Sequence, residues 1–289
     1  MSARQAGPYW LTAPALAVYA AFLVMPLASI GLISFQHFEF YGGIQPGLTL
    51  ENYRAVLGDS YYWEIFGRTF TIAVLATLFC AVLGTLEAIV LYRMADPWRS
   101  VFLLVVLGPL LISVVVRTLG WALLFGSTGL LNKAFLTLGV ISEPIQFMYS
   151  TTGVVIALVH VLVPFVVISV WASLQRMDPA VERAAVSLGA DQLAVVRRII
   201  VPLTMPGILA GSVIVFALAA SAFATPAIIG GRRLKVIATA AYDEFLNTLN
   251  WPLGASLAVL LLLTNVALLY LSNRLIERHF KAVFAETAT

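Results

Sequence analysis

The sequence predicts an all-α membrane protein with about six transmembrane helices. Hydrophobic residues make up 61% of its 289 residues, charged residues make up only 11%, and the mean hydropathy is +0.96. Soluble domains carry about a quarter charged residues, so this composition excludes a soluble domain. Apolar windows of about 20 residues, the length that a helix needs to cross a bilayer, also recur along the chain. They run approximately over residues 10–35, 69–92, 101–125, 151–174, 203–229 and 253–272.

The first window, residues 10–35, is predicted to be a retained span and not a signal peptide. It is longer than the apolar core of a signal peptide and contains Pro14 and Pro26. It also lacks a basic cluster before it and a persuasive cleavage site of small residues after it. We therefore expect residues 1–289 to form a single transmembrane domain.

The later windows carry prolines and closely spaced glycines that predict the shape and packing of the spans. Prolines are tolerated in membrane helices where neighbouring groups satisfy the freed carbonyls, and here they predict kinks. They stand at positions 109, 164, 206 and 226. Gly207 and Gly211 are four residues apart, a spacing that favours close helix contact, either within the bundle or between two subunits.

Residues 175–202, between the fourth and fifth windows, are charged and are predicted to hold two short helices. Asp178 followed by Pro179 is typical of an N-cap and a first helical residue. Gly189 predicts the end of this helix, because glycine is favoured just beyond a helix C-terminus. Apolar residues at i, i+3, i+4 and i+7 give the helix one apolar face. They are Val181, Ala184, Ala185 and Leu188.

Asp191 is predicted to cap the second helix of this segment, and Pro202 is predicted to end it. Arg197 and Arg198 are expected to face water or phosphates. The residues expected to pack inward are Leu193, Val195, Val196, Ile199 and Ile200. From the residues alone, the segment fits either an amphipathic hairpin that lies on the membrane surface or a rigid element that a soluble partner contacts.

The distribution of Lys and Arg predicts that both termini lie in the cytoplasm, because basic residues are enriched in cytoplasmic loops. In that orientation ten basic residues lie inside and six outside, and residues 175–202 are cytoplasmic. The inner set is Arg4, Arg93, Arg99, Arg176, Arg183, Arg197, Arg198, Arg274, Arg278 and Lys281. The outer set is Arg54, Arg68, Lys133, Arg232, Arg233 and Lys235.

Other classes of protein find little support in the residues. The net charge of +3 comes from basic residues spread beside apolar segments, which favours membrane orientation over nucleic-acid binding. The single cysteine, Cys80, is expected to be a small buried hydrophobe, and we expect neither a metal site nor catalytic residues. A secondary transporter is less favoured because the two halves of the sequence show no inverted repeat. An ion channel is less favoured because no filter loop or ring of charges is evident in the sequence.

Residues 182–202 resemble the EAA loop of binding-protein-dependent ABC importer permeases. In that loop a Glu-Ala-Ala cluster precedes a glycine, which is followed after nine residues by an Ile-x-Leu-Pro ending. The matching residues are Ala184, Ala185, Gly189, Ile199 and Pro202. Two positions differ from the pattern. Arg183 stands where glutamate is usual, with Glu182 one residue earlier, and Val201 replaces the usual leucine.

The resemblance extends over nearly the whole chain and is closest to the permeases of polyamine (spermidine/putrescine) importers. It is carried by short blocks whose order and spacing agree together. The blocks are TLENY at 49–53, Arg68 with Thr69, Arg117 with Trp121, GLLN at 129–132, Pro164 with Phe165, PGILAG at 206–211, Phe223 with Pro226, Gly230 and Gly231, and NWPLG at 250–254.

This resemblance implies a permease in the bacterial cytoplasmic (inner) membrane, with a cytoplasmic EAA-type coupling helix between spans 4 and 5. A dimer of ATP-binding cassette ATPase subunits, a second permease and an extracytoplasmic solute-binding protein are the implied partners, and a permease heterodimer is favoured. The chain has no G-x-x-x-x-G-K-[ST] phosphate-binding motif, so we expect no enzymatic activity or cofactor in this chain and ATP hydrolysis by a partner.

In the implied mechanism, five residues of the loop contact the ATPase. Glu182 and Arg183 would make charged contacts, Ala184 and Ala185 would allow close approach, and Gly189 would let the chain turn. The solute is expected to be a polyamine or a related organic cation. Phosphonates, opines and ferric ions remain alternatives, because similar permeases import them.

Six residues are candidates for the solute pathway. Glu87 is the only acidic residue inside a predicted span, where charges are functional candidates, although it could equally reach the cytoplasmic interface near Arg93. Arg117 is expected to anchor to a carbonyl or an acidic loop residue, with a solute contact as the alternative. His160 is expected to be a hydrogen-bonded packing residue, with a pathway role as the alternative. The aromatic candidates, which could line a gate, hold a cation or simply pack, are Trp121, Phe216 and Phe223.

Overall fold

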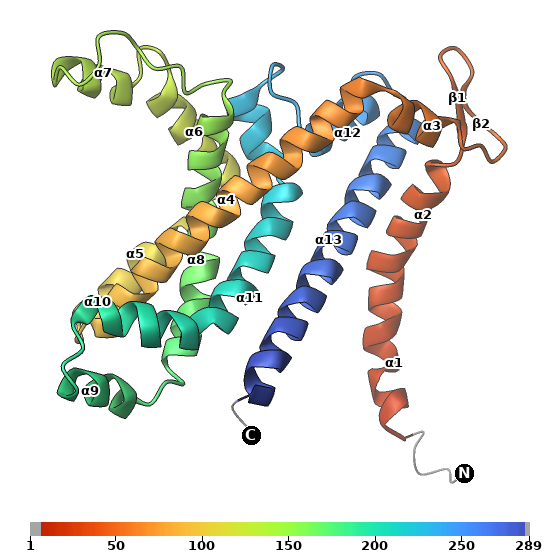
Figure 1. Ribbon diagram of the computed structural model, residues 1–289. Coiled ribbons are helices and arrows are strands. Elements are labelled where there is room, and N and C mark those ends of the chain that lie inside the picture. The colour runs from red at the N-terminus through yellow and green to blue at the C-terminus, as the bar shows by residue number, and fades with distance from the viewer. Residues whose placement is uncertain (1–6, 287–289) are drawn as a thin grey trace. The chain divides into compact units, whose positions relative to one another are not determined.

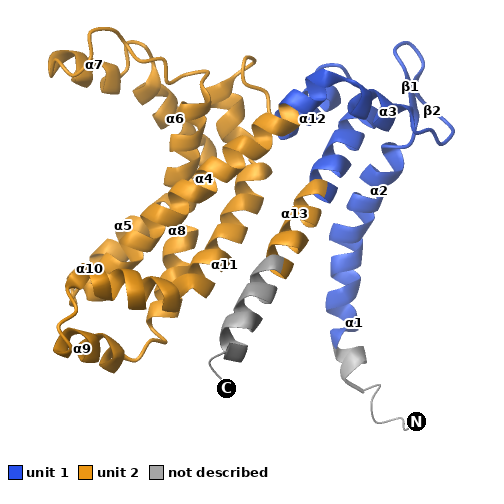
Figure 2. Cartoon of the chain, viewed as in Figure 1, with its two compact units in different colours: residues 1–64, 237–263 blue, residues 65–236, 264–289 orange. Residues whose placement is uncertain are grey.

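The computed structural model describes residues 7–286, with side chains described for residues 12–274. The chain divides into two compact units, which Figure 2 distinguishes by colour. Unit 1 comprises residues 1–64 and 237–263, and unit 2 comprises residues 65–236 and 264–289. Arg4, which contributes to the predicted orientation, lies outside the described residues, as do the side chains of Arg278 and Lys281.

The prediction of an all-α membrane protein with about six spans is confirmed. Six stretches of the described chain are long and apolar enough to cross a membrane. They are Thr12–Ile33, Ser60–Arg93, Val114–Thr137, Thr151–Leu174, Gln192–Ala220 and Trp251–Arg274. A shorter apolar helix covers Trp98–Leu111.

Unit 1 begins with a continuous helix and continues through a small hairpin. The helix consists of α1 (Gly7–Tyr19), a π-helical turn (Ala20–Val24) and α2 (Met25–Ile33). The two strands, β1 (His37–Glu39) and β2 (Gly43–Gln45), pair antiparallel with His37 opposite Gln45. The remaining elements of the unit are α3 (Glu51–Gly58), α12 (Ile237–Leu246) and the first part of α13 (Trp251–Glu286).

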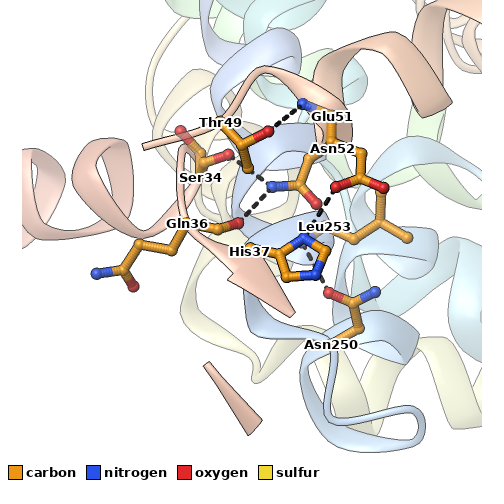
Figure 3. Close-up of polar contacts among 8 residues, drawn as sticks. All are labelled: Ser34, Gln36, His37, Thr49, Glu51, Asn52, Asn250 and Leu253. Atoms are coloured by element: carbon orange, nitrogen blue, oxygen red, sulfur yellow. Dashed lines mark hydrogen bonds and ion pairs between the residues drawn. The ribbon is translucent and has the colours of Figure 1, made fainter. Parts of the chain in front are cut away.

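A polar network joins the end of α2 to α3 (Figure 3). The Asn52 Nδ2 donates to the carbonyl oxygens of Ser34 at 3.0 Å and Gln36 at 2.8 Å. The Thr49 Oγ1 accepts from the N–H of Glu51, the first residue of α3, at 3.1 Å. The TLENY block therefore closes the chain between α2 and α3, because its side chains bind backbone groups that would otherwise be unpaired.

Unit 2 contains the remaining spans, and its helices are labelled in Figure 1. They are α4 (Ser60–Arg93, which begins in unit 1), α5 (Trp98–Leu111), α6 (Val114–Phe125), α7 (Leu130–Thr137), α8 (Thr151–Leu174), α9 (Pro179–Ser187), α10 (Gln192–Val195) and α11 (Val201–Ala220). Two π-helical turns, Val196–Ile200 and Pro226–Gly230, follow α10 and α11.

The centre of unit 2 is the pairing of α8 with α11, which lie side by side in Figure 1. A Cβ atom added at Gly207 would lie 2.5 Å from the carbonyl oxygen of Ser169, and one added at Gly211 would lie 2.8 Å from the α-carbon of Val166. These distances are too short for any side chain. The close contact predicted from the two glycines therefore lies within the bundle.

The third predicted window, residues 101–125, is not one helix in the structure. It is divided into α5 and α6, with Ile112 and Ser113 in extended conformations between them. The two helices contain 14 and 12 residues, about 21 and 18 Å, so each is shorter than a hydrocarbon core of about 30 Å. The apolar stretch Val114–Thr137 reaches a spanning length because it includes α7 as well as α6. The residues after the break are the β-branched run 114–116, whose helix propensity is low. The chain therefore has a broken helix where the window predicted a continuous one.

Other boundaries also differ from the predicted windows. The fourth window, residues 151–174, coincides with α8, but α4 begins nine residues before the second window because its helix continues through residues 60–68, which include the charged Glu64 and Arg68. The fifth window extends to residue 229, whereas α11 ends at Ala220. Pro226 is incompatible with a continuous helix through residues 222–226, since its ring would clash with the carbonyl of residue 222.

Asn132, from the GLLN block, holds the segment that follows α7. It is fully buried, and its Nδ2 donates to the carbonyl oxygens of Gly126 and Ile145, each at 3.0 Å. Its Oδ1 accepts from the Ile145 N–H at 2.8 Å. One side chain thus satisfies three backbone groups and fixes the connection from α6 to α8.

Candidate functional site

Helix α9 has the boundaries that its sequence predicts. The Asp178 Oδ1 accepts from the Ala180 N–H at 2.8 Å, and Pro179 is the first helical residue, so the predicted N-cap is confirmed. After the helix, Gly189 has φ +89°, and the Ala190 N–H donates to the Ala185 carbonyl at 3.0 Å. This arrangement is a glycine-dependent helix C-terminus, and it turns the chain toward α10.

The second helix of the segment begins as predicted, but it does not end where predicted. The Asp191 Oδ1 accepts from the Ala194 N–H at 2.8 Å, which confirms the cap. The prediction that Pro202 ends the helix is wrong, since the helix is continuous over Gln192–Ala220. A π-helical turn at Val196–Ile200 directly precedes α11, and Pro202 is the second residue of α11, where its missing N–H matters least.

The two apolar faces of this segment differ in their packing. Val195 and Ile200 are fully buried against unit 2, as predicted for the second helix, but Leu193 is 72% exposed. Val181 and Leu188, on the predicted apolar face of α9, are exposed, and Leu188 is 89% exposed. Ala184 is also exposed, and of the four residues of this face only Ala185 is partly covered by the described part of the chain.

One ion pair joins α9 to the end of α4. The Arg93 Nη2 lies 3.0 Å from the Glu182 Oε1, and both side chains are partly shielded from solvent. Arg93 is the last residue of α4, where the helix dipole also favours a positive charge. Glu182, predicted to contact a partner, is therefore engaged within this chain, whereas Arg183 is exposed and has no side-chain partner among the described residues.

Three of the six pathway candidates lie together in a hollow of about 590 Å³ between α6 and α8. The Trp121 Nε1 donates to the His160 Nδ1 at 3.1 Å, and Arg117 lies beside them on the same wall. The Trp121 ring also packs on Phe125, with ring centroids 4.8 Å apart. Among the described residues that line the hollow, none is acidic.

Arg117 is only 9% exposed, and its Nε and Nη1 are buried with no hydrogen-bond partner among the described residues. The carbonyl or acidic anchor expected for this side chain is therefore not made by these two nitrogen atoms. Burying guanidinium N–H groups without hydrogen-bond partners is costly.

The other three pathway candidates are not brought together with this group. Phe216 stacks on Phe70, with ring centroids 6.2 Å apart, and lines a different hollow of about 290 Å³. Phe223 lies in the break that follows α11 and is partly exposed. Glu87 lies in α4, partly buried, with no hydrogen-bond or ion-pair partner among the described residues.

Comparison with known proteins identifies the family. Residues 73–282 match the family of binding-protein-dependent transport system inner membrane components. The chain belongs to this family. It is a multi-pass permease subunit of an ABC importer in the inner membrane, as the resemblance of the EAA loop implies.

The permease is 36% identical over 213 residues to the spermidine/putrescine transport system permease protein PotB of Escherichia coli (strain K12), covering 74% of this chain and 77% of the relative. It is 27% identical over 260 residues to a putative 2-aminoethylphosphonate transport system permease protein, PhnU, of Salmonella paratyphi A, covering 90% and 88% of the two chains.

The fold of the permease is also that of solved transporters. It matches the structure of a bacterial ABC transporter involved in the import of the acidic polysaccharide alginate, with a TM-score of 0.80, 18% identity and coverage of 95% of this chain and 96% of that chain. A second structure shows the alginate ABC transporter in complex with an alginate pentasaccharide-bound periplasmic protein, with a TM-score of 0.78, 18% identity and 95% coverage of each chain. At this identity the likeness concerns the fold alone.

Proposed function

We propose that this permease imports a polyamine or a related organic cation, delivered by an extracytoplasmic binding protein and driven by a separate ATPase dimer. A second permease, which we propose to be a different chain, completes the membrane pathway. Both termini and α9 then lie on the cytoplasmic side, in agreement with the excess of basic residues there. The observation that carries the proposal is the 36% identity to PotB together with the capped helix α9.

Coupling to the ATPase is proposed to occur through α9. Its N-cap at Asp178 and its glycine-dependent end at Gly189 fix both termini of a nine-residue helix. On one side the chain leads back to α8, and on the other the turn at Gly189 leads into α10, which continues into α11. A force on α9 is therefore delivered to the two helices that form the centre of unit 2.

The hollow that contains Arg117 favours a second candidate solute. A solute with a carboxylate or a phosphonate would supply a partner for a guanidinium that has none for two of its nitrogen atoms. The likeness to a putative 2-aminoethylphosphonate permease over 90% of the chain agrees with this alternative, because that solute carries both an amine and an anionic group.

Uptake into vesicles tests the proposal. The permease pair, reconstituted with its ATPase and loaded binding protein, should accumulate labelled putrescine when ATP is supplied. Vesicles without the ATPase should accumulate none, with or without an ion gradient. Uptake driven by a gradient alone would refute the ABC mechanism. Uptake of 2-aminoethylphosphonate in place of putrescine, abolished by Arg117→Gln, would establish the second candidate.

The ion pair between Arg93 and Glu182 should matter more for coupling than for stability. We expect Arg93→Gln to change the free energy of unfolding by less than about 1 kcal/mol, the usual range for a partly exposed pair. Uptake per ATP hydrolysed should fall, because α4 is no longer joined to α9. The ratio of solute transport to phosphate release measures this effect.

Two controls separate this ion pair from a general loss of charge. Exchanging the partners, Arg93→Glu with Glu182→Arg, should restore the ratio. Arg99→Gln removes a nearby arginine that donates to the Met94 carbonyl, at 2.9 Å from its Nε, and should leave the ratio unchanged. Equal effects of the Arg93 and Arg99 substitutions would show that the pair has no specific role.

A further inference from the structure

The acidic and basic side chains of residues 175–202 differ in whether they have a partner within the chain. All three acidic side chains are engaged within the chain: Asp178 and Asp191 cap helices, and Glu182 pairs with Arg93. The four basic side chains are exposed and have no partner in the described part of the chain. They are Arg176, Arg183, Arg197 and Arg198. The segment therefore presents an excess of unpaired positive charge.

On helix α9 the acidic Glu182 and the basic Arg183 lie on different sides of the helix. Glu182 and Ala185, three residues apart, lie on the face that the chain partly covers. Arg183 lies on the exposed side of the helix together with Val186 and Ser187, three and four residues later. Figure 1 shows α9 beyond α10, at the end of unit 2. Arg183 is therefore the charged residue that α9 offers to a molecule that covers its open face.

This inference rests on the proposed ATPase partner. We infer that α9 docks into an ATPase groove with an apolar floor and at least one acidic side chain, which pairs with Arg183. The exposed Val186 and Leu188 supply the apolar contact, and the guanidinium requires a carboxylate when solvent is excluded. Arg93 is a positioning residue in this interface, because it holds Glu182 away from the acidic groove.

The inferred contact places the positive charge on the permease and the negative charge on the ATPase, and this arrangement is specific to the chain. In the EAA pattern the position of Arg183 is occupied by glutamate, which would be repelled by the groove inferred here. Like charges placed together across an interface disfavour the wrong partner, so this permease is expected to discriminate among ATPases by charge. Arg176, Arg197 and Arg198 do not lie on α9 and are not part of the inferred contact.

Binding of the purified ATPase to the permease pair in nanodiscs tests the inference. Arg183→Gln should weaken binding, and Arg183→Glu should weaken it further, by about tenfold or more, because repulsion replaces attraction. Arg198→Glu is the matched control on the same segment and should have a smaller effect. The effect of Arg183→Glu should be the same in phosphatidylcholine and in phosphatidylglycerol discs. An effect found only with the anionic lipid would overturn the inference in favour of a membrane contact.

Crosslinking can identify the partner group directly. The chain has lysine only at positions 133, 235 and 281, so Arg183→Lys places a new amine on α9 that a carbodiimide can join to a carboxylate in contact with it. Mass spectrometry should then find an Asp or Glu of the ATPase joined at position 183. Normal ATPase binding without such a crosslink, or an unaffected Arg183→Glu variant, would overturn this inference alone. Failure of the unmodified permease to bind any ATPase would overturn the proposed function as well.

Discussion

Replacing Gly189 by valine is expected to uncouple ATP hydrolysis from solute transport. Gly189 has φ +89°, a conformation that β-branched residues adopt only under strain, although a Cβ there would meet no atom within 4 Å. The cost is therefore conformational, about 1–3 kcal/mol, and the chain can relieve it by turning α9 relative to α10. Transport should fall by about tenfold, which corresponds to roughly 1.4 kcal/mol, while ATP hydrolysis continues.

Gly139 offers a matched control for this substitution. It also has a positive φ, +69°, and a Cβ there would likewise meet no atom within 4 Å, but it lies in the connection after α7. Gly139→Val should introduce similar strain and leave the ratio of transport to hydrolysis intact. Gly189→Asn should be milder than valine, because asparagine tolerates positive φ. Full coupling in the Gly189→Val variant would show that the turn after α9 does not transmit the motion.

Replacing Gly207 by valine should separate α8 from α11 and destabilise the permease. The first carbon of any side chain at this position would meet the Ser169 carbonyl at 2.5 Å and the Ser173 Oγ even more closely. A backbone carbonyl in a helix cannot move aside as a flexible side chain can, so the helices must shift. Overpacking of this kind typically costs about 1–3 kcal/mol. Thermal unfolding of the purified permease complex measures the loss.

Gly108 is the control for this second substitution. It lies in α5, and a Cβ there would meet nothing within 4 Å. Gly108→Val should therefore lower the melting temperature by several degrees less than Gly207→Val, and Gly207→Ala should fall between them. At about 2–4 °C per kcal/mol for a domain of about this size, the difference is measurable. Equal melting temperatures would mean that α8 and α11 are not in the contact described.

Sequence reasoning predicted the features that depend on neighbouring residues. The N-caps at Asp178 and Asp191 and the turn at Gly189 follow from side chains that bind their own backbone or permit a rare conformation. The fourth span coincides with α8 because its apolar run is bounded by polar residues at both ends. The other spans differ from their windows, since hydropathy reports length and not helix continuity.

Features that depend on distant contacts could not be predicted in this way. Arg93 and Glu182 are 89 positions apart, so their pairing appears only when α4 and α9 are placed together. Pro202 was predicted to end a helix because proline usually does so. The prediction was wrong because the π-helical turn before it, which has no sequence signature, lets the helix continue. The TLENY and GLLN blocks were recognised only as family features, whereas Asn52 and Asn132 prove to bind backbone groups of neighbouring segments.

Helix α4 has a mechanical consequence for the permease. It contains 34 residues without a proline and is about 50 Å long, well beyond the thickness of a hydrocarbon core of about 30 Å. A straight helix does not shorten, so a force on its last residue, Arg93, moves the whole helix by translation or by tilt. A tilt of about 5° around the midpoint would carry each tip through roughly 2 Å. Through Arg93, a small movement of α9 is thus transmitted along α4 to the other end of that helix.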